Sequence, residues 1–385
     1  MSVLNVETPS WKTEELQILE EQVGKFLDKE AVPLLDKWIH QKHVDRDFWL
    51  KAGAAGLLCA SMPEEYGGGG GSFAHEAIID EALGLRGLGG FGAPLHSGIV
   101  GPYVLHYASE EQKKSWLPRL ATGELVSAIA MTEPGTGSDL QNVKTTAKKD
   151  GNHYVINGSK TFITNGGTAN FVIVVAKTDP TLGAKGISLI GVETDTVEGF
   201  RRGRILDKMG MPSADTAELF FDDVRVPTAN LLGREEGLGF VQLMSELPQE
   251  RLIVAIAGQA TIERALAETI AYVKQRKAFG KAIIDFQNTQ FKLAEAKTKA
   301  TASRVFVNYC IEQHLKGKLD PATASMAKMW LTDLENEIVD ECLQLFGGYG
   351  YMNEYPIARM YTDSRVQRIY GGTNEIMKVL IARTL

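Results

Sequence analysis

The sequence predicts an α+β protein in three domains: a helical N-terminal domain, a middle antiparallel β domain and a C-terminal four-helix bundle. Apolar residues recur at helical spacing before residue 126 and after residue 236, and short strand-like segments lie between these regions. No long helical segment separates these strands, so we expect an antiparallel sheet rather than a Rossmann domain that binds a nicotinamide cofactor. We place the domain boundaries at residues 1–125, 126–232 and 233–385.

Helical periodicity defines the N-terminal domain. Within residues 12–30, one face carries Leu16, Leu19, Val23, Phe26 and Leu27. Further helices are predicted at Asp47–Ala60 and Ser72–Leu83. Ser109–Gln112 spells a capping box, which predicts the start of a helix that ends near Gly123.

The middle domain is predicted from short segments rich in β-branched and aromatic residues. They are Val126–Ala130, Tyr154–Asn157, Thr161–Thr164, Phe171–Lys177, Ile187–Val192 and Ala217–Phe221. Asn157-Gly158 has the composition of a tight turn, so we predict that it joins the second and third segments as a two-residue hairpin.

The C-terminal domain is predicted to contain helices over about 238–276, 286–315 and 321–346, and a last segment after Gly372. Pro248 lacks an N–H, so it either opens the first of these helices or kinks it. Glu250 follows two residues later and has two interpretations. It is an acid that favours the helix dipole by about 0.3–1 kcal/mol, or a base in an apolar pocket with a raised pKa.

Composition excludes several classes of protein. The net charge of −7 over 385 residues gives no basic surface for nucleic acid. Cys59, Cys310 and Cys342 lie far apart, without disulfide or metal-site spacing, so we expect no metal. No apolar run is long enough for a membrane span. The first residues resemble neither a secretory signal nor a transit peptide, and we expect a cytoplasmic protein.

Two polar turns follow predicted strands. In the first, MTEPGTGSD (131–139), the glycines allow backbone N–H groups to approach a ligand, and Thr132 and Ser138 add hydroxyls. The second, TFITNGG (161–167), has the aromatic ring of Phe162 beside the hydroxyl of Thr164. Each is equally consistent with an ordinary loop, but together they could clamp a flat ring with polar edges.

The C-terminal half has further glycine-rich and basic motifs with two interpretations each. Arg276 ends a predicted helix, where a cation favours the dipole. The double glycines at 347–348 and 371–372 either cap helices or allow backbone N–H groups to approach a phosphate or carbonyl oxygen.

Taken together and in this order, the motifs resemble the acyl-CoA dehydrogenase family from the N-terminal helices to the last residue. The sequence motifs on which the resemblance rests are MTEPGTGSD, TFITNGG, SELPQER (245–251), QRKAFGK (275–281), QLFGGYGY (344–351) and RIYGGTNEI (368–376). The resemblance implies the three-domain fold, a homotetramer, and FAD held between the β domain and the bundle with help from a neighbouring subunit. It also implies electron transfer to an electron-transfer flavoprotein.

The resemblance also implies the residues of the site. FAD contacts are expected at Met131, Thr132, Gly137, Ser138, Phe162, Ile163, Thr164, Arg276, Phe279, Gln287, Gln344, Leu345, Gly347, Gly348, Thr373, Asn374 and Glu375. Many relatives have Trp where this chain has Phe162. The acyl-CoA substrate is expected to contact Ser138, Val241, Met244, Arg251, Gly371 and Gly372.

The position of the catalytic base distinguishes the branches of the family. Short- and medium-chain members carry a glutamate at the position of Gly371, whereas long-chain and isovaleryl members carry it on the bundle helix. ELPQER resembles the long-chain form, so we assign Glu250 as the base. Glu375, one helical turn beyond Gly371, is the rival candidate, although the resemblance gives it a cofactor or capping role.

The predicted reaction is therefore FAD-dependent α,β-dehydrogenation of a long-chain acyl-CoA to the trans-2-enoyl-CoA. The rival substrate is a branched-chain or terpenoid acyl-CoA. Two rival functions on the same fold are an acyl-CoA oxidase and a non-catalytic assembly protein.

Overall fold

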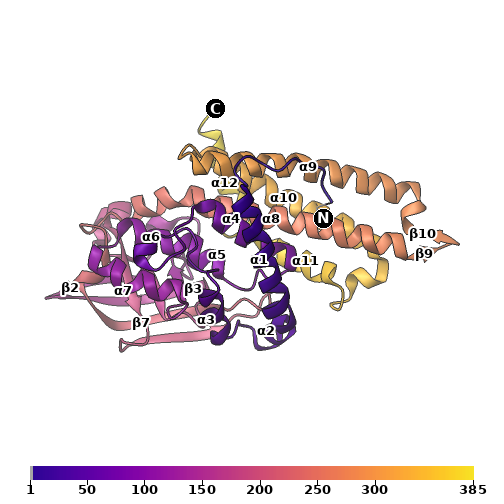
Figure 1. Cartoon of the computed structure of the whole chain (residues 1–385). Coiled ribbons are helices and arrows are strands. Elements are labelled where there is room, and N and C mark those ends of the chain that lie inside the picture. Colours follow the sequence, from indigo (N-terminus) through magenta and orange to yellow (C-terminus); the bar gives the residue numbers. More distant parts are fainter. Residues whose placement is uncertain (1–2) are drawn as a thin grey trace.

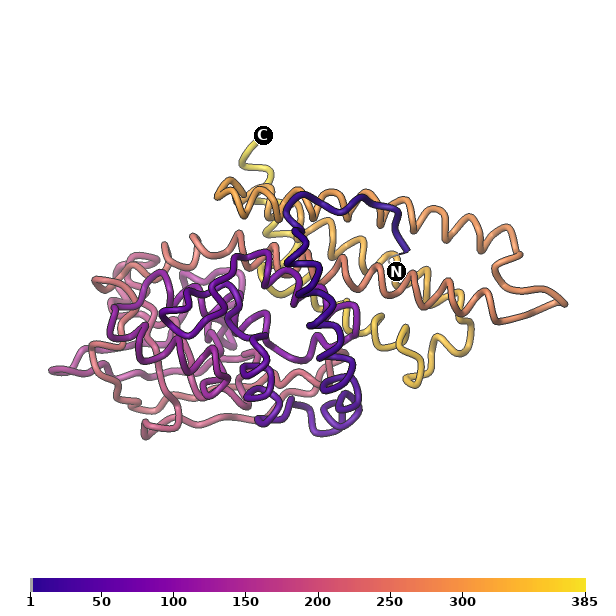
Figure 2. Tube along the Cα trace, viewed as in Figure 1, coloured from indigo at the N-terminus to yellow at the C-terminus, as the bar shows by residue number. Residues whose placement is uncertain are grey.

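The computed structural model describes residues 3–385 and confirms the predicted fold: a helical N-terminal part, a β part and a helical C-terminal part. Figure 1 shows the sheet and the N-terminal helices at one end, with the long C-terminal helices extending past them to the other end. Figure 2 shows the N-terminal segment running over the bundle before α1 (Glu14–Glu30) begins. Leu4 and Trp11 of this segment are buried against the bundle.

Short helices make up the rest of the N-terminal part. They are α2 (Leu35–Gln41), α3 (Arg46–Ala54), α4 (Phe73–Arg86), α5 (Ala93–Leu95), α6 (Gly101–Tyr107) and α7 (Glu110–Ala121), and a π-helical turn at His96–Val100 joins α5 to α6. The capping box at Ser109 is confirmed, because Ser109 Oγ accepts from the Gln112 N–H at 3.3 Å and Gln112 Oε1 accepts from the Ser109 N–H at 2.6 Å. The predicted helix Asp47–Ala60 is too long, since α3 ends at Ala54, before Gly56 with φ +74°.

The sheet has eight strands in the order β6-β7-β3-β2-β4-β5-β8, and β1 pairs with β4. The strands are β1 (Ser127–Ala130), β2 (Thr146–Asp150), β3 (His153–Thr164), β4 (Phe171–Lys177), β5 (Ile187–Glu193), β6 (Phe200–Ile205), β7 (Thr216–Pro227) and β8 (Leu231–Leu232). The purely antiparallel prediction is wrong at β4, which runs parallel to β1 and to the first residue of β2. The chain forms the β2–β3 pair between β1 and β4, which supplies the long connection that a parallel pair needs.

The hairpin predicted at Asn157-Gly158 is also wrong. Both residues lie inside β3, where the register with β7 shifts between Ile156 and Gly158. A Cβ on Gly158 would lie 2.4 Å from Thr145 Oγ1, so a side chain does not fit there. The glycine therefore serves a β-bulge with close backbone approach rather than a turn.

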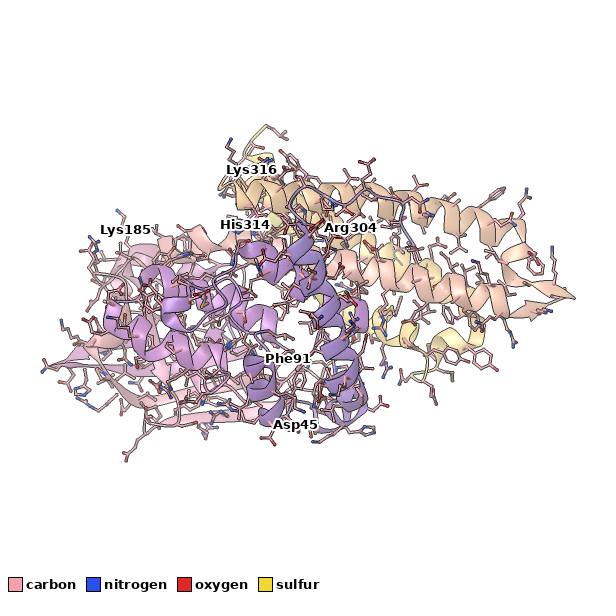
Figure 3. The ribbon with its side chains drawn as sticks, in the orientation of Figure 1. Asp45, Phe91, Lys185, Arg304, His314 and Lys316 are labelled. Atoms are coloured by element: carbon pink, nitrogen blue, oxygen red, sulfur yellow. The ribbon has the colours of Figure 1, made fainter. Side chains whose placement is uncertain are left out.

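Three long helices and two short ones form the C-terminal part. They are α8 (Gly239–Gln275), α9 (Gln287–Leu315), α10 (Pro321–Phe346), α11 (Pro356–Ser364) and α12 (Asn374–Ala382), and a small hairpin of β9 (Lys277–Ala278) and β10 (Lys281–Ala282) joins α8 to α9. Pro248 lies inside α8, so it does not open the helix. Figure 3 shows Arg304 and His314 on α9. Arg304 ties α9 to the other helices by ion pairs to Glu81 of α4 and Glu263 of α8.

Candidate active site

Glu250 is a buried carboxylate at the contact between α8 and α6. Its side chain accepts a hydrogen bond from Tyr103 Oη at 2.7 Å, and the two residues are 6% and 0% exposed. Burial raises the pKa of Glu250 to about 7, the Tyr103 hydrogen bond opposes that rise, and the nearby Glu246 adds to it. Glu250 lies far from the start of α8, so it does not stabilise the helix dipole there. Its buried position and raised pKa are instead those expected of a general base.

The residues on either side of Glu250 are fixed by other elements. Gln249 Nε2 donates to the carbonyl of Gly98 at 2.6 Å, and Gln249 Oε1 is 2.8 Å from Nε2 of His314. Arg251 is buried and its Nη1 donates to Ser325 Oγ of α10 at 3.3 Å, a direction that the sequence did not indicate. Three separate elements thus hold this segment of α8 in place.

The YGGT loop passes close to the same part of α8. Gly371 has φ +65°, and a Cβ there would lie 3.6 Å from Val254 Cγ2, one turn beyond Glu250. Lys328 is fully buried and its Nζ donates to the carbonyl of Gly372 at 2.8 Å and to Asn374 Oδ1 at 2.9 Å. These bonds fix the loop, so a backbone group at Gly371 has a defined position relative to α8.

The rival carboxylate, Glu375, has a different environment. Thr373 caps α12 by accepting from the Ile376 N–H at 3.4 Å, and Glu375 lies exposed in the first turn of that helix. Its own backbone N–H and the Thr373 hydroxyl lower the pKa of Glu375. An exposed acid with a lowered pKa is suited to capping, whereas a base that works near neutral pH needs a raised one.

The two polar turns of the β domain lie side by side. The Thr161 N–H donates to the carbonyl of Thr132 at 2.9 Å. Phe162 is 67% exposed with φ +59°, while Ile163 is buried and Thr164 is half-buried. A bulky residue with positive φ costs about 1–3 kcal/mol, and such strain clusters at ligand sites. The ring of Phe162 is therefore held in an exposed position, where a ligand can reach it.

A buried ion pair that we did not predict holds the first turn. Lys160 Nζ donates to Glu133 Oε1 at 2.9 Å and to the carbonyl of Met131 at 2.9 Å, and Glu133 also accepts from the backbone N–H of Thr145 at 2.8 Å. Gly137 and Ser138, later in this turn, remain exposed. The pair therefore fixes the base of the turn and leaves its outer half open to a ligand.

Most of the other predicted cofactor residues lie at the end of the molecule opposite the two polar turns. They gather around the β9–β10 hairpin and the end of α10, namely Arg276, Phe279, Gln287, Gln344, Leu345, Gly347 and Gly348. Figure 1 shows this end of the bundle pointing away from the β domain. Phe279 is 97% exposed, and Cβ atoms on Gly347 and Gly348 would meet open space. One chain therefore does not bring these residues together with Thr132 and Phe162.

The predicted substrate residues Val241 and Met244 lie on α8 before Glu250. They are 62% and 38% exposed, which is unusual for apolar side chains on the longest helix of the bundle. Helical spacing places Val241 on the face of α8 opposite Glu250 and Met244 about a third of a turn from it, so these two side chains do not form a path to the buried carboxylate.

Comparison with known proteins assigns this architecture. Residues 13–124, 128–224 and 237–385 match the domains described as "Acyl-CoA dehydrogenase, N-terminal domain", "middle domain" and "C-terminal domain". The chain belongs to the acyl-CoA dehydrogenase family. It is 51% identical over 373 residues to the long-chain specific acyl-CoA dehydrogenase, mitochondrial, of Sus scrofa, a match covering 96% of this chain and 86% of that protein.

Solved structures of acyl-CoA dehydrogenases share the fold of this chain. The acyl-CoA dehydrogenase of Geobacillus kaustophilus is 50% identical, with a TM-score of 0.96 and coverage of 98% of this chain and 99% of that one. A glutaryl-CoA dehydrogenase from Mycobacterium smegmatis in complex with FADH2 is 27% identical, with a TM-score of 0.90 and coverage of 97% and 94%. The chain is thus an enzyme of a family that uses FAD. Within residues 3–385, no helix is both long and apolar enough to cross a membrane.

Tyr103, Glu133, Lys160 and Lys328 were missed by reasoning from the sequence. Tyr103 lies in a helix without a recognisable motif, and the two lysines are charged residues that a sequence alone places at the surface. Only their partners, brought from distant segments, give them a role near the site.

Proposed function

We propose that this enzyme dehydrogenates long-chain acyl-CoA thioesters to trans-2-enoyl-CoA, with Glu250 as the base. The observation that carries the proposal is the buried Glu250 carboxylate, whose pKa is raised to about 7 beside a loop that has glycine at position 371. General-base catalysis is most efficient when the pKa of the base lies near the working pH.

The side chains suit proton removal from the carbon next to the thioester. Glu250 takes the α-proton, and Tyr103 holds the ionised carboxylate in position before that step. The backbone N–H of Gly371 is the proposed donor to the thioester carbonyl, which would make the α-proton more acidic. Bound FAD would supply the acceptor for the β-hydrogen as hydride. The exposed ring of Phe162 and the open turn at Gly137 and Ser138 fit a planar cofactor with a polar tail.

A small cavity further along α8 has room for about one water molecule, so it does not accommodate an acyl chain. Its lining includes Leu57, Ile79, Pro94, Gly98 and Ile253, the last of which is three residues beyond Glu250. A Cβ on Gly98 would lie 2.6 Å from Ile253 Cδ1, so Ile253 packs directly against this glycine and a larger residue does not fit there.

Two acids of α4, Glu76 and Asp80, also line this cavity. Burial raises the pKa of Asp80 well above its ordinary value and also raises the pKa of Glu76.

A complete FAD site in this proposal needs a second copy of the chain. The cluster around Arg276 and Phe279 lies far from Phe162 in one chain, so we propose that it contacts the FAD of a neighbouring subunit in a homotetramer. We further propose an electron-transfer flavoprotein as acceptor and the cytoplasm as location. The three cysteines are free and buried, which is consistent with a reducing compartment.

Anaerobic mixing with acyl-CoA substrates tests the proposal. Loss of flavin absorbance and formation of the enoyl product are measured over a series of chain lengths, together with one 3-methyl substrate. We expect the fastest bleaching with long straight chains. A maximum with the 3-methyl substrate would favour the branched-chain alternative, peroxide release in air would favour an oxidase, and no bleaching with any acyl-CoA would refute the proposal.

A further inference from the structure

Glu250 is enclosed, yet the proposed reaction gives it a proton in each turnover. A buried base must pass that proton to water before it can act again. The helix that supplies Tyr103 also carries His106, which contacts Glu246 of α8 and is exposed to solvent.

The contacts form two levels between α6 and α8. At the inner level, Tyr103 donates to Glu250 at 2.7 Å. At the outer level, one turn away on each helix, His106 Nδ1 is 2.8 Å from Glu246 Oε1. Residues four positions apart on a helix are neighbours, so the carboxylates of Glu246 and Glu250 lie on the same face of α8.

Exposure increases along these residues. Tyr103 is fully buried, Glu250 is 6% exposed and Glu246 is 8% exposed, whereas the side chain of His106 is 51% exposed. An imidazole can take a proton at one nitrogen and release one from the other. His106 is therefore the point at which this series of residues meets water.

We propose that Tyr103, Glu246 and His106 form a relay that carries the substrate's α-proton from Glu250 to solvent. The relay rests on the proposed function. Glu250, once protonated, donates to Tyr103 Oη, whose own proton passes to the Glu246 carboxylate. This is the one step without a direct hydrogen bond; what supports it is that the charge of Glu246 acts on both Tyr103 and Glu250. Glu246 passes a proton to His106 Nδ1, and Nε2 releases one to water. One proton enters at Glu250 and one leaves at His106, without any change in oxidation state.

The test follows the proton separately from hydride transfer. The FAD-loaded enzyme is incubated in D2O with 3-thiapalmitoyl-CoA, in which sulfur replaces the β-carbon and no β-hydrogen remains. Deuterium at the α-carbon is measured by mass spectrometry. Exchange requires that the proton on Glu250 reach solvent, because a trapped proton returns to the same carbon.

We expect His106→Gln and Glu246→Gln to slow this exchange about tenfold or more, the scale of a lost proton-transfer group. Anaerobic bleaching of His106→Gln by palmitoyl-CoA should stay within about twofold of wild type, because Glu250 itself remains. Glu246→Gln also removes a charge that raises the pKa of Glu250, so its bleaching is compared with wild type across a pH series. Added imidazole should restore exchange in His106→Gln. His40→Gln is the matched control, since His40 is an exposed histidine of α2 whose Nδ1 lies 2.6 Å from the carbonyl oxygen of Asp36.

Unchanged exchange in His106→Gln, a mild surface substitution, would overturn the relay while bleaching still supports the dehydrogenase. Equal loss of bleaching and exchange in both variants would also overturn it, because that pattern indicates a damaged site. A wild-type enzyme that exchanges the α-proton but is not bleached by any acyl-CoA would instead refute the proposed dehydrogenation and keep the relay.

Discussion

Tyr103→Phe removes the hydrogen bond to Glu250 while keeping the aromatic ring. In the folded enzyme this bond, at 2.7 Å between two buried side chains, opposes the rise in the pKa of Glu250 that burial causes. A hydrogen bond to a charged group contributes about 1.5–3 kcal/mol, and about 1.4 kcal/mol corresponds to one pKa unit. The variant should therefore have a Glu250 pKa about one to two units higher.

This shift predicts a specific pH profile. At pH 7 the ionised fraction of Glu250 falls from about one half to about 1–10%, so anaerobic bleaching should slow about 5- to 50-fold. The rate should recover at higher pH, once Glu250 is again ionised. Stopped-flow bleaching by a long-chain acyl-CoA across a pH series measures both the loss and the recovery.

Tyr66→Phe provides a matched control, because Tyr66 Oη donates to Glu110 at 2.8 Å in the N-terminal part. It should leave the profile unchanged. A Tyr103→Phe enzyme that is equally slow at every pH would refute the pKa argument and indicate that the hydroxyl only positions the carboxylate. A profile like that of wild type would refute both roles.

Three other substitutions have defined outcomes. Phe162→Ala should weaken FAD retention about tenfold, as expected for loss of aromatic stacking, in a flavin-release assay with an unchanged melting temperature. Lys160→Met should destabilise the fold by about 3–5 kcal/mol in thermal melts, because it leaves Glu133 buried without its partner, and adding Glu133→Gln should recover part of that loss. Glu250→Gln should stabilise the enzyme by up to about 3 kcal/mol above pH 7, and the gain should shrink as pH falls and vanish below about pH 4. The wild-type enzyme loses stability as pH rises through this range, because the pKa of Glu250 is raised from 4.5 to about 7 and the folded state therefore binds more protons than the unfolded state.

The fold could be predicted because each region has one dominant hydrophobic period. The order of helices, strands and helices needed only this periodicity, and the capping box at Ser109 needed only local hydrogen bonding. The errors arose where tertiary contacts decide the structure. Asn157-Gly158 has the composition of a turn, but the approach of Thr145 makes it a bulge inside β3.

The site could be predicted only in part. Glu250 was assigned by resemblance and by the absence of an acid at position 371, and its burial and pKa agree with that role. Its partner Tyr103 lies 147 positions away in sequence, so no local pattern could connect the two. Lys160 was missed for the same reason, because its burial depends on an ion pair with a residue from another turn.

Anaerobic titration of Glu250→Gln with a long-chain acyl-CoA asks directly whether Glu250 is the base. We expect this variant to retain yellow FAD and to bind the substrate without being bleached, while Glu375→Gln is bleached like wild type. Bleaching of Glu250→Gln at the wild-type rate would show that another group removes the α-proton.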